Sequence, residues 1–65
     1  MKKFGANLKR IRKSKGISQE KLANELGFSQ PHLVKIELGY VNTSISHLAA
    51  LAKALGVPTA DLVNL

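Results

Sequence analysis

The stretch from Ser18 to Gly39 constrains the fold of this 65-residue chain more than any other. Ser18 and Ser29 each precede apolar residues at helical spacing, and a serine hydroxyl at that position accepts a backbone N–H of the first turn. Gly27 and Gly39 follow the apolar stripes, where a residue in the left-handed conformation commonly ends a helix. The pattern therefore predicts two short helices joined by a tight turn.

The rest of the chain has the same helical periodicity. Phe4, Leu8 and Ile11 recur at steps of four and three and form one apolar stripe, which ends before Gly16. No segment alternates apolar and polar residues for long enough to form a strand. We therefore expect a single all-α domain over residues 1–65, with five short helices at about 3–15, 18–26, 29–38, 44–55 and 59–63. The predicted apolar face of the fourth helix comprises Ile45, Leu48, Leu51, Ala52 and Leu55.

Arg12 borders the apolar stripe of the first helix, four residues after Leu8. A partly buried guanidinium needs a carboxylate partner, because an unpaired charge is costly to remove from water. Glu37 lies next to the inward-facing Ile36 and is the natural candidate. The alternative is that both side chains are solvated.

The charge balance of the chain is strongly basic. Ten Lys and Arg residues against four Asp and Glu give a formal net charge of +6 and a pI of about 10.1. This balance indicates an anionic partner, most often nucleic acid, although a merely soluble basic surface has the same composition. The absence of cysteine excludes disulfides and thiolate metal sites and fits a cytoplasmic location. No apolar run approaches the roughly 20 residues of a membrane span.

Catalytic chemistry has little support in this sequence. No two of the four acidic residues are spaced as a convincing catalytic pair, and His32 and His47 are isolated. The glycines lie at helix ends and do not form a phosphate-binding loop. We therefore expect no enzymatic activity, no metal, no cofactor and no small-molecule ligand.

Two helices joined by a glycine-containing turn describe a helix-turn-helix, whose second helix can enter the major groove of DNA. The same periodicity also allows a plain helical hairpin. A protein-binding helical module and an RNA-binding basic bundle are further alternatives. RNA binding is disfavoured because Phe4, Phe28 and Tyr40 are the only aromatic residues available to stack on single-stranded bases.

The runs SQEKLANELG, KIELG and SISHLAALAKALGV, with Ser29 between the first two, resemble the lambda-type phage repressor and Cro family, also called the XRE family. The likeness spans about residues 7–62. It implies a lambda-repressor-like domain that binds double-stranded DNA sequence-specifically and regulates transcription. The helix over 29–38 is then the recognition helix.

The resemblance also implies roles for individual residues. Gln19 corresponds to a glutamine that reaches a DNA phosphate and can touch the recognition helix, and Gln30 to a side chain that reaches base edges, where an amide pairs with adenine. Arg12 and Glu37 correspond to an internal ion pair of the family. The predicted DNA-binding residues are Ser18, Gln19, Ser29, Gln30, Pro31, His32, Val34, Lys35, Tyr40, Asn42, Lys9, Arg10 and Lys13.

The sequence departs from the family pattern at several positions. Val34 stands where relatives often have a polar residue. It can contact the methyl group of a thymine, or it can pack at the border of the core. Leu38 replaces an Arg or Asn that contacts phosphate. Pro31 has no donor to offer a base, and Thr43 occupies a position where proline is common.

One recognition helix reads only a few base pairs, so helix-turn-helix proteins commonly pair on half-sites about 10 base pairs apart. Several apolar residues exceed what a small core needs: Leu38, Tyr40, Val41, Val63 and Leu65. We therefore expect a symmetric homodimer on a palindromic operator, with Leu62, Val63 and Leu65 of the C-terminal half at the interface. The alternative is that these residues pack within the monomer.

Overall fold

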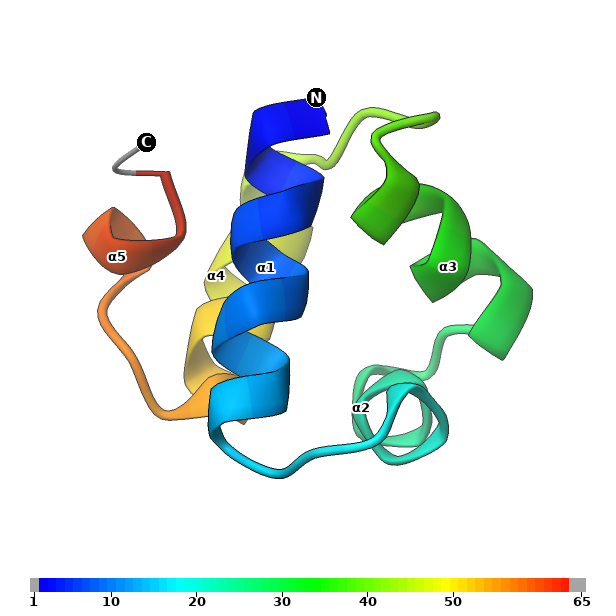
Figure 1. The fold of residues 1–65 in the computed structure, drawn as a ribbon, viewed down its shortest axis with the longest axis horizontal. Helices are drawn as coiled ribbons and strands as arrows, with labels where there is room; N and C mark the ends of the chain where they lie inside the picture. Colours follow the sequence, from blue (N-terminus) through cyan, green and yellow to red (C-terminus); the bar gives the residue numbers. More distant parts are fainter. Residues whose placement is uncertain (1, 64–65) are drawn as a thin grey trace.

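The computed structural model describes residues 2–63 and contains only α-helices and loops over that range. The helices are α1 (Lys2–Ser14), α2 (Gln19–Leu26), α3 (Gln30–Leu38), α4 (Ile45–Leu55) and α5 (Thr59–Val63). The predicted all-α class is confirmed, and each predicted boundary agrees to within one residue. In Figure 1, α1 stands in the centre with α4 behind it, α5 on one side and α2 and α3 on the other. No helix among the described residues is long and apolar enough to span a bilayer.

Serine and glycine residues mark the helix ends as predicted. The hydroxyls of Ser18, Ser29 and Ser44 each accept the backbone N–H three residues later, at 3.1 to 3.2 Å. Gly27 ends α2 in the left-handed conformation with φ 70°. The Phe28 N–H then donates to the Ala23 carbonyl at 2.9 Å, and this bond turns the chain from α2 into α3.

A single hydrophobic core joins the five helices. Its largest fully buried side chains come from every helix: Leu8, Leu22, Leu33, Ile36, Leu51 and Leu62. Leu62 therefore belongs to the interior of the monomer, and its predicted place at a dimer surface is wrong. Val41, which we had expected to be surplus to the core, also packs against it.

Ile45 corrects another expectation. It is 86% exposed, although the apolar face of α4 was predicted to include it. The inward face of α4 is formed by Leu51, Ala52 and Leu55, with Leu48 partly buried beside them. Ile45 is the first residue of α4 and lies at the edge of that face, so no other helix covers it.

Two glycines let the backbones of α1 and α3 approach closely. Gly5 is buried in α1, and a Cβ at this position would lie under 3 Å from the carbonyl oxygens of Ile36 and Glu37. Gly39, at the end of α3 with φ 80°, approaches the backbone of Lys2 in the same way. Both contacts bring the N-terminal half of α1 against the C-terminal half of α3.

Asn7 attaches α5 to α1. Its side-chain amide donates to the carbonyl oxygens of Asp61 and Leu62, each at 2.9 Å. These carbonyls lie at the C-terminal end of α5, where a helix leaves its acceptors without partners. The side-chain oxygen of Asn7, Oδ1, in turn accepts a hydrogen bond from Arg10 Nη2.

Replacement of Gly5 by alanine tests the close approach of α1 and α3. Helix propensity alone predicts that Gly5→Ala stabilises the protein by about 1 kcal/mol. The buried contact predicts the opposite sign, because the added methyl group meets two backbone carbonyls that cannot rotate away. We expect the free energy of unfolding to fall by about 1–3 kcal/mol in urea titrations. A more stable variant would contradict the packing described above.

Candidate nucleic-acid interface

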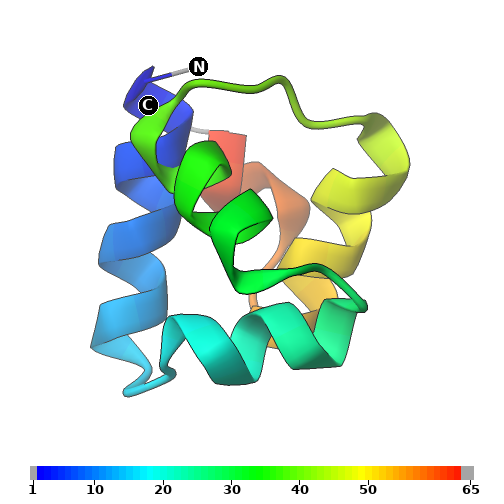
Figure 2. The same ribbon diagram turned by 90° about the vertical axis from the view of Figure 1, so that its right-hand side faces the viewer.

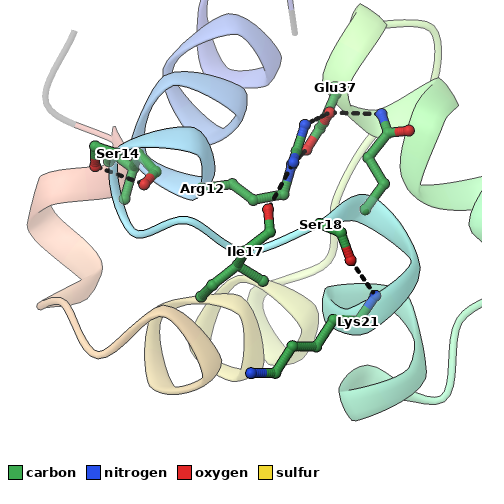
Figure 3. A network of polar contacts seen from close by, with 8 residues as sticks. Arg12, Ser14, Ile17, Ser18, Lys21 and Glu37 are labelled. Carbon is green, nitrogen blue, oxygen red and sulfur yellow. Dashed lines mark hydrogen bonds and ion pairs between the residues drawn. The ribbon is translucent and has the colours of Figure 1, made fainter.

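A buried ion pair sets the position of α3 (Figure 3). The Arg12 Nε donates to Glu37 Oε2 at 2.6 Å, and Nη2 donates to Oε1 at 3.2 Å. The two side chains are only 7% and 2% exposed, so neither is solvated. A third Arg12 nitrogen, Nη1, donates to the Ile17 carbonyl at 2.7 Å and holds the loop between α1 and α2.

Gln19 joins this network from the first turn of α2. Its Nε2 donates to Glu37 Oε1 at 2.9 Å, so the carboxylate receives hydrogen bonds from two different helices. The contact ties the start of α2 to the last turns of α3 and fixes the angle between the helices of the turn motif. Gln19 thus touches α3, and contact with this helix is one of the two roles that the family resemblance implied for it.

The outer face of α3 is the exposed surface of the motif. Figure 2 shows α3 at the front of the bundle, above α2, with one side turned outward. Leu33, Ile36 and Glu37 point inward. The outward positions are occupied by Gln30, Pro31, Val34, Lys35 and Leu38, and the first four of them line a shallow pocket.

The polar side chains at the N-terminal ends of α2 and α3 cap these helices or pack against neighbouring rings. Ser18 and Ser29 use their hydroxyl oxygens as helix caps, and each retains its own proton as a donor. His32 is half-buried, and its ring packs edge-on against Phe28 with the centroids 5.0 Å apart. His47 of α4 contacts the same ring at 4.8 Å. His32 is therefore partly withdrawn from the outer face of α3.

Tyr40 and Asn42 lie in the loop that leaves the C-terminal end of α3 and leads to α4 (Figure 2). Both are exposed, and Tyr40 is 70% accessible to solvent. Tyr40 directly follows Gly39, the residue that ends α3, and Asn42 lies two residues further along the loop.

Three basic residues of α1, Lys9, Arg10 and Lys13, are predicted to bind DNA, and all three are exposed. Lys9 is four residues from Gly5 and three from Arg12, both of which contact α3, so it borders that side of α1. Arg10 lies on the side of α1 that faces α5, because it binds Asn7 and lines a pocket with Asp61. Lys13 is exposed on the solvent side of α1.

Sequence reasoning missed the two residues that position neighbouring helices, Gly5 and Asn7. Neither has a local signal, because each acts through a contact with a distant helix.

Over residues 2–63 there is also no group of three or more side chains arranged to bind a metal ion.

A helix-turn-helix that presents the outer face of its second helix on a strongly basic chain has the architecture of a DNA-binding domain. The helix-turn-helix family model matches residues 8–62. The chain belongs to the XRE-type helix-turn-helix family of DNA-binding transcriptional regulators.

Three similar proteins illustrate the relationship. An uncharacterized HTH-type transcriptional regulator of Sinorhizobium fredii, y4dJ, is 42% identical over 63 residues, which cover 97% of this chain and 82% of the relative. The control protein C.BamHI of Bacillus amyloliquefaciens is 40% identical over 94% of this chain and 76% of its own length. The crystal structure of the restriction-modification controller protein C.AhdI from Aeromonas hydrophila superimposes with a TM-score of 0.89 at 36% identity, and covers 94% of this chain and 92% of that structure.

The buried ion pair generates a prediction about stability. Arg12→Met leaves Glu37 buried without its charged partner, and we expect a loss of about 3–5 kcal/mol in the free energy of unfolding. The double variant Arg12→Met/Glu37→Met removes both charges and should recover most of this loss. Urea titrations at constant pH and salt measure both effects.

Lys13→Met is the matched control, since it makes the same change at an exposed neighbouring position and should alter stability by less than about 0.5 kcal/mol. If Arg12→Met unfolded at the same urea concentration as the parent protein, the ion pair would not contribute to the fold.

Proposed function

We propose that this protein is a sequence-specific transcriptional regulator that inserts α3 into the major groove of double-stranded DNA. The observation that carries the proposal is the outer face of α3, which is exposed although the helix is held firmly from its inner side by Leu33, Ile36 and Glu37. The fixed start of α2 beside it, with Ser18 and its first-turn N–H groups, suits a DNA phosphate.

Gln30 is the residue best placed for direct base recognition. It is exposed at the first position of α3, where the recognition helix of such motifs contacts base edges. Its amide can pair with adenine through two hydrogen bonds, and Lys35, one turn further along the helix, can donate to guanine or to a phosphate. We place the action of this regulator in the cytoplasm.

We further propose that the active species is a homodimer on a palindromic operator. Charge is distributed unevenly along the chain, and after Gly39 the only charged residues are Lys53 and Asp61. In this weakly charged half, Ile45 and Val63 expose 86% and 48% of their surface. A second copy of the chain suits exposed apolar side chains in a weakly charged region, because a two-fold contact pairs identical patches without burying charge. Leu65, also predicted at this interface, lies outside the described residues.

Base recognition by Gln30 is tested with DNA selected from a random duplex library. Gln30→Ala should weaken binding to the selected site by about 1–3 kcal/mol and relax the preference at one base pair. Binding to random duplexes should change little. Asn24→Ala, which removes an exposed amide from α2, is the control and should leave the preference intact. Equal losses on selected and random DNA would place Gln30 at the backbone instead.

Dimerisation is tested by sedimentation equilibrium at micromolar concentration. Val63→Glu should shift the protein toward monomer, because it places a charge in a desolvated contact and repels its symmetry mate. Ala6→Glu adds the same charge at an exposed position of α1 and should leave the association unchanged. A parent protein that is monomeric both alone and on DNA, with a single half-site protected, would refute the proposed dimer.

A further inference from the structure

The outer face of α3 is apolar along most of its length. Pro31, Val34 and Leu38 follow one another at steps of three and four and therefore lie along one side of the helix. Pro31 is exposed, Val34 is half-buried and Leu38 is 47% exposed. Because Leu33 and Ile36 already fill the inner face, α3 has apolar side chains on two opposite sides. Packing within the monomer accounts for only one of them.

The polar groups beside the outer stripe of Pro31, Val34 and Leu38 indicate which kind of partner binds there. Gln30 and Lys35 line the same shallow pocket as Pro31 and Val34, so the stripe is bordered by an amide and a cation. The only carboxylate of α3, Glu37, is turned inward and bonded to Arg12 and Gln19. The outer face of α3 therefore presents positive charge and hydrogen-bond donors beside apolar side chains, with no acidic group among them.

This combination matches the floor of the DNA major groove. Phosphates on either side of the groove attract the cation, base edges accept and donate hydrogen bonds, and the 5-methyl group of thymine is an apolar feature of that groove. A cation beside an apolar stripe, with no acidic group among them, suits the negative potential of DNA.

We infer that Val34, flanked by Pro31 and Leu38, reads the 5-methyl groups of thymines in the operator half-site. The inference rests on the proposed function, since α3 must enter the major groove for the contact to form. At a rise of 1.5 Å per residue the stripe is about 10 Å long, which corresponds to about three base-pair steps. Val34 lies near its centre. Gln30 and Lys35 supply the hydrogen bonds on either side, and the thymine methyl groups supply the apolar contact.

The experiment removes the methyl group from the DNA while leaving base pairing intact. The operator selected from a random library is prepared with deoxyuridine in place of each thymidine of one half-site in turn. Binding of the protein should weaken about fourfold at each thymine whose methyl group is buried against the stripe, and should not change at the others. Val34→Ala should lose this response, and Val34→Ile, which keeps an apolar branch at the same place, should retain it.

Gln30→Ala is the matched control within α3, because it should lose affinity and yet keep the response to deoxyuridine. Thermal unfolding followed by circular dichroism verifies that each variant is folded. Specific binding that is insensitive to deoxyuridine at every position overturns the inference and leaves the placement of α3 in the groove intact. Failure to enrich any duplex overturns the proposed function and this inference together. If Val34→Ala alters sedimentation of the protein rather than the deoxyuridine response, the stripe is a protein interface and the inference is wrong.

Discussion

The hydrogen-bonded pair of Arg12 and Glu37 is the interaction on which the rest of the structure depends. Three segments meet at this point: α1 supplies the guanidinium, α3 the carboxylate, and the loop after α1 a backbone carbonyl. Gln19 adds the start of α2. Apolar burial drives the chain to collapse but has no direction, whereas these hydrogen bonds have fixed lengths and angles. In a 65-residue chain with a small core, they determine how the helices of the motif are oriented.

The close contact between α1 and α3 complements the ion pair. Gly5 lets the backbones meet, and Gly39 ends α3 beside the first residue of α1. Side chains at these positions would separate the helices and draw Arg12 away from Glu37. Steric fit and electrostatic pairing therefore act on the same inner side of α3. All of the anchoring lies on that side, and the outer side is left available for a partner.

The two halves of the chain differ in what they expose. The first half holds nearly all the charge, and the outer face of α3 presents an amide, a cation and an apolar stripe. The second half contributes the core of α4 and α5 and has few charges. Asn7 of α1 joins the two halves, because its side-chain amide donates hydrogen bonds to two carbonyl oxygens at the end of α5. This contact attaches α5, which carries Val63 of the surface proposed for a second copy, to α1, which packs against α3.

The sequence by itself determined the helices, because their signals are local. Serine caps, left-handed glycines and apolar residues at helical spacing act within a few residues, and the predicted boundaries of all five helices follow from them. It also pointed to the pairing of Arg12 with Glu37, since a charge beside an apolar stripe needs a partner. Only the tertiary structure decided which side of each helix faces the core, a neighbouring helix or solvent. It buried Leu62, exposed Ile45 and turned Arg10 toward α5. These outcomes depend on contacts between helices far apart in the chain, whose angles and separations no local pattern specifies.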